Sequence, residues 1–296
     1  MPFVWINGDY ADESAASVSV RDTGLLHGVG VFTTLRTAGG RCVRLDAHLA
    51  RLRESCDAFV IPLAYKDADL ETAAEGVLER NGLADARMRI TVTRGVTEID
   101  PVHGPHARPN VFITAAPFEP YPAEYYEKGL TTLVLDEQKL NPYDPQAGHK
   151  TLNYLSRLAA LREANRRGAG EALWFNVHNF LQSGCVSNVF LVKDSVLVTP
   201  PTQAELRQDA ARDATPYKRS NVLPGTTRAA VLAAAEDESI PVELRAVTID
   251  DVLSADEVFL TNSVMSVMPV CRIERRAIGD EKPGRLTRQF AATLGR

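Results

Sequence analysis

Hydrophobic residues recur along this chain at two different spacings, which predicts a mixture of helices and strands. In residues 46–59 apolar positions return every three or four residues, the spacing of one helix face, and Asp46 can cap that helix. In residues 88–93 apolar and polar residues alternate, as in a strand buried on one side. The apolar positions of the helix are Leu49, Leu52, Cys56 and Phe59.

Turn and cap residues delimit the other elements of the first half. We expect a first strand that ends at the Asn7-Gly8 turn. A second helix is expected to begin near Asp67 and to end at Asn81-Gly82. Residues 111–114 are predicted to form another strand.

The second half also mixes the two patterns. Residues 152–167 place apolar residues on one predicted helix face, with charge opposite, before Gly168 and Gly170 end the helix. Residues 172–175 predict a buried strand, and residues 188–197 a hairpin that turns at Asp194-Ser195. The apolar helix face consists of Leu152, Leu155, Leu158, Ala159 and Leu161.

Three prolines in residues 117–122 indicate a linker between two domains. We therefore expect a mixed α/β (α+β) protein with a small α/β domain over residues 1–116 and a larger domain over residues 123–296. Residues 202–220 are polar and rich in alanine, and we expect a surface insertion there.

Composition and charge exclude several classes of protein. The formal net charge is −5 and no basic run occurs, so we expect no nucleic-acid partner. No apolar stretch is long enough to span a bilayer, and residues 1–8 lack the features of a signal peptide, so we expect no membrane association and a cytoplasmic location. The four scattered cysteines are expected to be reduced thiols, with Cys185 a small buried residue, and no metal-binding motif is present.

Lys150 is the first residue that suggests a chemical role. Lysine is rare in this chain, with seven among 33 basic residues, and Lys150 lies where a Gly- and Pro-rich loop leads into a helical pattern. An amine, unlike a guanidinium, can lose its proton and form a Schiff base with a carbonyl group. A solvated lysine near a helix start is the plainer interpretation, and local sequence leaves it open.

A second segment suggests phosphate binding. In residues 223–228, a glycine and two threonines precede an apolar helical run, which would present free N–H groups, two hydroxyls and the positive end of the helix dipole. A simple N-cap role for Thr226 would explain the same pattern. Arg51 is a candidate for a forked phosphate contact, although a solvated helix charge is the alternative. A Schiff-base lysine and a phosphate site together suggest pyridoxal 5′-phosphate.

Six segments together resemble one known family. Residues 21–36 (Arg-Asp-Thr-Gly-Leu-Leu-His-Gly at their start), and the motifs around Arg51, Lys150 and Asn188, are similar to those of the class IV aminotransferases. The phosphate-site segment and residues 256–270 match in the same order. This family of fold-type IV enzymes includes branched-chain aminotransferases, D-amino acid aminotransferases and 4-amino-4-deoxychorismate lyases.

The resemblance implies a fold, a cofactor and a set of site residues. Family members are dimers in which loops of the partner complete the pocket, and the cofactor lies between a small N-terminal and a larger C-terminal domain. Lys150 would form the Schiff base with pyridoxal 5′-phosphate and move the proton at the substrate Cα, and Tyr154 would lie near the phenolic oxygen of the cofactor. The resemblance implies phosphate contacts from Arg51, Thr226, Thr227 and Ser263, and further cofactor contacts from Ser183, Ser187, Asn188, Leu223 and Asn262.

Departures from the family pattern bear on the reaction. Ser183 stands where the family has a glutamate that pairs with the pyridine nitrogen, and a serine cannot do so by charge. Either Gln182 or an acid from elsewhere in the chain compensates, or the chemistry needs a weaker electron sink, as in an elimination. Thr33 replaces the glutamate of a common Phe-Glu pair, and residues 96–100 lack the Arg and His that D-amino acid aminotransferases use there. Residues 262–269 resemble the lyase branch.

Several functions remain open at this point. Phe32, Arg36, Arg89 and Arg94 are candidates for substrate contact, with structural salt bridges as the alternative for the arginines. We expect amino-group transfer between an amino acid and a keto acid as the leading reaction. Elimination that releases pyruvate from 4-amino-4-deoxychorismate is the alternative that Ser183 favours, and a pyridoxal-phosphate-binding protein with little catalysis is the third.

Overall fold

The computed structural model describes residues 2–96, 108–208 and 219–295 and divides the chain into two compact units. The first unit contains Met1–Pro120 and also His149–Asn153, and the second contains Tyr121–Gly148 and Tyr154–Arg296. The sequence-based division has one boundary, at residues 117–122. The structure adds a five-residue segment, His149–Asn153, that belongs with the first unit although the chain around it belongs with the second.

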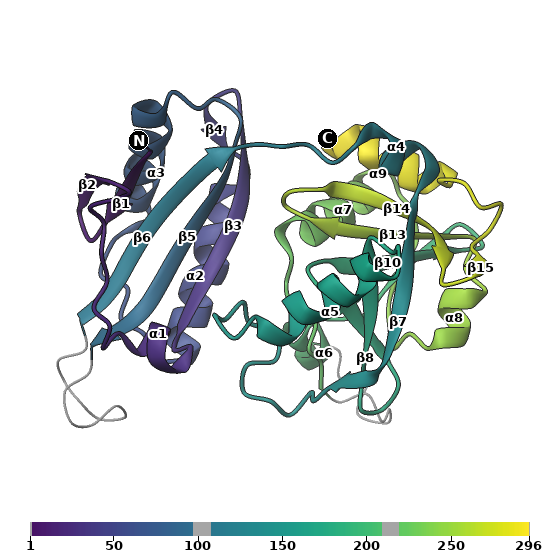
Figure 1. Cartoon of the computed structure of the whole chain (residues 1–296). Coiled ribbons are helices and arrows are strands. Elements are labelled where there is room, and N and C mark those ends of the chain that lie inside the picture. Colours follow the sequence, from purple (N-terminus) through teal and green to yellow (C-terminus); the bar gives the residue numbers. More distant parts are fainter. Residues whose placement is uncertain (1, 97–107, 209–218, 296) are drawn as a thin grey trace. The chain divides into compact units, whose positions relative to one another are not determined.

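The first unit is a six-stranded sheet with two helices on one face (Figure 1). The helices α2 (Leu45–Ala58) and α3 (Asp67–Asn81) bury their apolar residues against Val31, Leu35 and Ile90 of the sheet. The sheet order is β2-β1-β6-β5-β3-β4. Its strands are β1 (Phe3–Ile6), β2 (Asp9–Asp12), β3 (Gly30–Ala38), β4 (Arg41–Cys42), β5 (Ala86–Val96) and β6 (Arg108–Pro117), and the short helix α1 (Thr23–His27) precedes β3.

Backbone pairing explains why His149–Asn153 belongs to the first unit. Thr151 pairs antiparallel with Val31 of β3. On either side of this pair, the Phe32 N–H donates to the Lys150 carbonyl and the Leu152 N–H donates to the Gly30 carbonyl, both at 2.9 Å. The segment therefore extends the sheet beyond β3, and these backbone bonds fix the position of Lys150 along the strand.

The second unit is built on a nine-stranded sheet. The order is β12-β11-β10-β13-β14-β7-β8-β9, with β15 paired to β14. The strands are β7 (Leu130–Leu140), β8 (Glu171–Asn176), β9 (Leu181–Gly184), β10 (Asn188–Lys193), β11 (Val196–Thr199), β12 (Val242–Leu244), β13 (Glu257–Asn262), β14 (Ser266–Ile273) and β15 (Arg276–Ala277). The helices are α4 (Ala123–Lys128), α5 (Leu155–Arg166), α6 (Gln203–Gln208), α7 (Thr226–Asp237), α8 (Ile249–Leu253) and α9 (Arg285–Leu294).

Two helices of the second unit, α7 and α9, pack on β10 and β13 of this sheet. The helices α7 and α9 cover Phe190 of β10 and Phe259 of β13, whose rings stack with centroids 5.0 Å apart. Phe290 of α9 packs against Phe259 at 5.9 Å. Because β10 and β13 are antiparallel neighbours, with Asn188 opposite Thr261, the start of β10 and the end of β13 meet at one edge of the sheet.

Most of the predicted elements are confirmed. Asn7 and Gly8 both have positive φ in the β1–β2 turn, as do Asp194 and Ser195 between β10 and β11. Helix α3 spans Asp67–Asn81 and ends at Gly82 in the left-handed conformation. The predicted buried strand is β8, in which every residue is buried.

Three local predictions are wrong. Arg44, not Asp46, is the N-cap residue of α2, and Asp46 lies in the first turn. Helix α5 begins at Leu155 rather than at residue 152, because the preceding residues pair with β3. It also buries Ala160 and Ala164 instead of the leucine face, since Leu155 is 83% and Leu158 50% exposed.

The predicted surface insertion over residues 202–220 is only partly a surface segment. Thr202, Leu206 and Ser220 are buried, and α6 lies within the first part of the stretch. Residues 209–218 of this prediction lie outside the described residues. In the part of the chain that the structure describes, we find no helix with both the length and the apolar character needed to cross a bilayer.

Candidate active site

Lys150 lies against an aromatic ring of the first unit. Its Nζ is 4.7 Å from the centroid of Phe32, and the guanidinium carbon of Arg89 is 3.5 Å from the same centroid. Phe32 is 5% exposed, and Arg89 also donates to the Thr91 hydroxyl at 3.0 Å. The structure therefore brings together three of the residues that the sequence predicted for the site. Such contacts of a cation with a ring face are worth about 0.5–2 kcal/mol each, depending on their exposure.

Arg51 lies on α2 beside two buried polar side chains. Its Nη2 donates to Thr33 Oγ1 at 3.0 Å, and this oxygen is 2.6 Å from His48 Nδ1. Burial, together with the smaller effects of the positive charges of Arg51, Arg44 and Lys150, lowers the pKa of His48 to about 3. His48 is therefore neutral at physiological pH. Neither Thr33 nor His48 was among the predicted site residues.

The other two arginine candidates are partly buried. The Arg36 guanidinium carbon is 4.2 Å from the centroid of Phe118, in the same unit. The Nε atoms of Arg36 and Arg94 are buried, with no hydrogen-bond partner in the described parts of the chain. Residues 96–100, which lack the Arg and His of D-amino acid aminotransferases, are mostly outside the described part of the chain. Val96 ends β5, and residues 97–100 lie outside the described residues.

In the second unit, the predicted phosphate segment forms the N-terminus of α7. Gly225 is the N-cap residue with extended backbone, so Thr226 is the first helical residue rather than the cap. The Thr226 and Ser263 hydroxyls are 3.2 Å apart. Thr227 is 2% exposed, and its Oγ1 is buried without a hydrogen-bond partner among the residues described. Hydroxyls and N–H groups at the start of a 12-residue helix form a site that suits an anion.

Two asparagines hold the chain around this helix terminus. Asn188 Nδ2 donates to the Leu223 carbonyl at 2.9 Å. A Cβ on Gly225 would lie 2.0 Å from Asn188 Oδ1, so only glycine permits this approach. Asn262 Oδ1 accepts from the Val264 and Met265 N–H groups, both at 2.8 Å, and so holds the turn that carries Ser263. The predicted residues Asn188, Leu223 and Asn262 thus position the helix terminus and the neighbouring turn.

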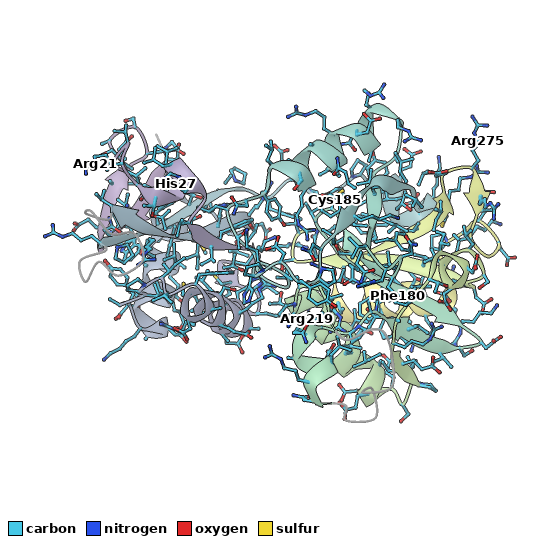
Figure 2. All side chains as sticks on the ribbon, turned by 90° about the horizontal axis from the view of Figure 1, so that it is seen from below. Arg21, His27, Phe180, Cys185, Arg219 and Arg275 are labelled. Carbon is cyan, nitrogen blue, oxygen red and sulfur yellow. The ribbon has the colours of Figure 1, made fainter. Side chains whose placement is uncertain are left out.

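Ser183 is a buried hydroxyl on β9, and Phe180 and Cys185, which precede and follow this strand in the sequence, are labelled in Figure 2. Its Oγ has no hydrogen-bond partner within the described ranges. The neighbouring Gln182 is fully buried, and its side chain is engaged by backbone: Oε1 accepts from the Asn221 N–H, and Nε2 donates to the Leu181 carbonyl. The Gln182 amide therefore binds backbone groups of Asn221 and Leu181.

Glu171 is a structural carboxylate that the sequence analysis missed. It is 2% exposed at the start of β8 and accepts hydrogen bonds from four groups. These donors are the N–H groups of Ala172, Cys185 and Val186 at 2.9–3.0 Å, and the Ser187 hydroxyl at 2.8 Å. Glu171 therefore fixes the turn between β9 and β10, and the Ser187 hydroxyl serves that turn. An acid next to an otherwise apolar strand is the signal that could have revealed it.

Tyr154 and Cys185 are linked through Arg157. The Arg157 guanidinium carbon is 5.9 Å from the Tyr154 ring centroid, and Nη1 donates to the Cys185 carbonyl at 2.8 Å. Burial, and then the charge of Glu171, raise the pKa of the Cys185 thiol, so this cysteine is not a nucleophile. This confirms the prediction of a small buried residue. No group of three or more metal-ligating side chains occurs in residues 2–96, 108–208 and 219–295.

The comparisons with known proteins decide the family. The family model of amino-transferase class IV matches residues 30–273. The chain belongs to the class IV aminotransferase family. It is therefore an enzyme, and the family is one of pyridoxal-phosphate enzymes, as the sequence resemblance implied.

Individual class IV aminotransferases match over nearly the whole chain. A putative branched-chain-amino-acid aminotransferase of Methanocaldococcus jannaschii is 32% identical, over 97% of this chain and 93% of that protein. The crystal structure of the Escherichia coli branched-chain amino acid aminotransferase has a TM-score of 0.88 at 27% identity, covering 99% of this chain and 94% of that one. The structure of 4-amino-4-deoxychorismate lyase from Pseudomonas aeruginosa has a TM-score of 0.81 at 31% identity, covering 98% and 97%. The predicted fold-type IV architecture is confirmed.

Proposed function

We propose that this enzyme binds pyridoxal 5′-phosphate through Lys150 and transfers an amino group between an amino acid and a keto acid. Family membership supports the reaction class, and each unit contributes residues of suitable chemistry. The first unit provides an amine on Lys150 and a guanidinium on Arg51, and the second unit provides the hydroxyls at the start of α7.

The observation that carries the cofactor assignment is the Thr227 hydroxyl. A buried hydroxyl without a partner costs about 1–3 kcal/mol, so a protein retains one mainly where a ligand completes its hydrogen bonding. Thr227 Oγ1 is such an atom, and it lies in the first turn of α7, where the helix dipole favours negative charge. A dianionic phosphate ester meets both requirements. The residues therefore fit the cofactor.

Each residue has a distinct task in this proposal. Lys150 Nζ would hold the cofactor aldehyde covalently. Once the amine of the substrate has displaced it, the free Lys150 amine would remove the proton from the substrate Cα and return it during transfer. Arg51, Thr226, Thr227 and Ser263 hold the phosphate, and Tyr154 donates to the phenolic oxygen. When bound, pyridoxal phosphate supplies an electron sink for the bond that breaks at Cα.

The substrate is a small amino or keto acid. The Arg89 guanidinium, which shares the Phe32 ring with Lys150, is the candidate that we favour for the substrate carboxylate, with Arg36 and Arg94 as the others. The similarity to branched-chain aminotransferases supports a substrate with an aliphatic side chain for this enzyme. A guanidinium can bind a carboxylate through two parallel hydrogen bonds, which would orient Cα toward Lys150.

A second candidate function is elimination from 4-amino-4-deoxychorismate with release of pyruvate. The observation that favours it is the neutral Ser183, whose buried Oγ has no partner among the described residues. A hydroxyl opposite the pyridine nitrogen would stabilise a pyridinium less than a carboxylate does. The similarity to the lyase of Pseudomonas aeruginosa supports this alternative.

One product assay separates the candidates. Purified enzyme with pyridoxal phosphate is given L-glutamate and 4-methyl-2-oxopentanoate, and in a parallel reaction 4-amino-4-deoxychorismate. Formation of leucine supports transfer, whereas pyruvate from the second substrate alone establishes the lyase. A cofactor adduct at Lys150 without either product would identify a binding protein with little catalysis and contradict both reactions.

We also propose that the enzyme is a cytoplasmic homodimer. All four cysteines are free thiols, which suits a reducing compartment. An exposed apolar surface around α1 supports association, because Val20, Leu25 and Leu26 are 76%, 64% and 56% exposed.

A further inference from the structure

Two neutral side chains of the first unit hold the Arg51 guanidinium. Nη2 of Arg51 is 3.0 Å from Thr33 Oγ1, and that oxygen is 2.6 Å from His48 Nδ1. Thr33 is fully buried in β3, and His48 is 1% exposed in α2. Water therefore has little access to Thr33 and His48, and the hydrogen bond between the two side chains replaces bonds to water.

The direction of each hydrogen bond follows from the donors. A guanidinium has only donors, so Arg51 donates to Thr33 Oγ1, and the hydroxyl proton is left to donate to His48 Nδ1. Arg51 Nη2 also lies 3.5 Å from the same ring nitrogen, so two donors face Nδ1. An unprotonated Nδ1 satisfies both, and the lowered pKa of His48 agrees with a neutral ring. The three residues form a directed chain from Arg51 through Thr33 to His48.

The hydrogen bonds from Arg51 to Thr33 and from Thr33 to His48 orient the Arg51 guanidinium without neutralising its charge. Thr33 and His48 are uncharged, so neither of these two contacts pairs the guanidinium with a negative charge. They also restrict a long side chain, which reduces the entropy lost when an anion binds. We infer that Thr33 and His48 are positioning residues that hold the Arg51 guanidinium for the phosphate group of pyridoxal phosphate. The inference rests on the proposed function, because it takes the cofactor as the anion.

The test compares two aldehydes that differ only in the phosphate. Cofactor-free full-length enzyme is titrated with pyridoxal phosphate and, separately, with pyridoxal, and the bound aldehyde is followed by its visible absorbance. Thr33→Val removes the hydroxyl at nearly constant shape. We expect it to raise the Kd of pyridoxal phosphate about tenfold, the effect of one hydrogen bond to a charged group, and to change that of pyridoxal less than about twofold.

Three further variants make the test specific. Thr33→Ser keeps the hydroxyl and is expected to restore the wild-type Kd. His48→Leu removes the acceptor without altering Thr33 and is expected to weaken phosphate-dependent binding in the same direction, which keeps the inference testable if Thr33→Val does not fold. Thr37→Val is the matched control, because Thr37 is equally buried on the same strand but its hydroxyl bonds to the backbone of Ala84 and Ala86.

The outcomes separate the inference from the proposed function. Equal weakening of the binding of both aldehydes by Thr33→Val, or no weakening of either, overturns the positioning role. The same loss in Thr37→Val also overturns it. Binding of pyridoxal phosphate at Lys150 by the wild type would still uphold the proposed cofactor site. If wild-type enzyme binds neither aldehyde, the proposed function fails and the inference fails with it.

Discussion

Ser183 is the residue on which the choice of reaction depends. Its hydroxyl is buried on β9, and its side chain carries no charge with which to hold a protonated pyridine nitrogen. The neighbouring Gln182 amide is engaged by backbone groups. We propose that serine at this position, in place of the family's glutamate, makes the bound cofactor a weaker electron sink.

A charged residue at this position should therefore accelerate amino transfer. We expect Ser183→Glu to increase the rate of the first half-reaction with L-glutamate about tenfold or more, because a carboxylate would favour the protonated ring. Stopped-flow absorbance measures this rate. Ser183→Gln is the control of matching size without charge. If Gln accelerates the half-reaction as much as Glu, charge is not the cause.

His48 should make the stability of the first unit sensitive to acid. Its pKa is about 3 in the folded chain, against an ordinary value of 6.5. Between these values His48 is protonated in the unfolded chain and neutral in the folded chain. Its protonation therefore leaves the free energy of unfolding unchanged above pH 6.5 and lowers it progressively as the pH drops from 6.5 toward about 3. We expect wild type to lose more free energy of unfolding between pH 7 and pH 5 than His48→Asn, whose amide oxygen can replace the acceptor. Equal losses in denaturant titrations would contradict the assignment of a neutral, buried His48.

The roles of some single residues could be predicted from the sequence, and those of others could not. Lys150 stood out because lysine is rare in this chain and because its neighbours form a motif. Thr33, His48 and Glu171 gave little signal, because their roles depend on hydrogen bonds to residues that are 14–18 positions away or on another strand. Only the folded chain brings these partners together.

Among the elements, α7 is the one that carries the proposed phosphate ligands, and an ion pair of its buried Arg228 with the partly exposed Glu205 connects it to α6. Arg228 is 3% exposed and makes two hydrogen bonds to Glu205, at 2.8 and 2.9 Å. A third bond runs from Arg228 to the Pro200 carbonyl. Because Arg228 directly follows Thr226 and Thr227, the pair supports the helix turn that carries the proposed phosphate ligands.

Breaking this pair should destabilise the enzyme strongly. We expect Glu205→Gln to lower the free energy of unfolding by about 3 kcal/mol, since it leaves a buried guanidinium without its counter-charge. The matched control is Glu163→Gln on α5, which breaks an exposed pair with Arg166 and should cost less than about 1 kcal/mol. Chemical denaturation measures both. Equal costs would show that burial of the Arg228 pair is not decisive.

Element boundaries were predictable where a residue type dictated them. Gly82 ends α3 and Gly225 precedes α7, because the chain needs a left-handed residue at the first position and a close approach to Asn188 at the second. The buried face of α5 was not predictable. Leu155 and Leu158 are exposed while Ala160 and Ala164 are buried, since small residues let the helix lie close to β7 and β8. Hydrophobicity alone does not distinguish these two packings.

At the scale of the whole molecule, the two units are not simply consecutive in the chain. The chain returns to the first unit for His149–Asn153, and the backbone bonds to β3 hold that segment. Sequence motifs placed Lys150 in a loop before a helix but could not show that this loop adds to a sheet, because the pairing partner lies about 120 residues earlier. The family motifs did predict the fold type.

Association of two chains is a prediction at the same scale. Light scattering should give twice the 32.4 kDa mass of one chain. Leu25→Glu should shift the enzyme toward monomer, because Leu25 is an exposed apolar residue of α1, the helix whose last residue, His27, is labelled in Figure 2. Val60→Glu, at an exposed valine elsewhere in the first unit, should not. A monomeric wild type would contradict the proposed dimer.

The central claim is that Lys150 is the residue that binds the cofactor covalently. The most direct measurement reduces the enzyme with borohydride in the presence of pyridoxal phosphate and locates the adduct by peptide mass spectrometry. The account predicts one adduct, on Lys150, and its loss in Lys150→Ala. An adduct on another lysine, or an adduct that persists in Lys150→Ala, would contradict the account.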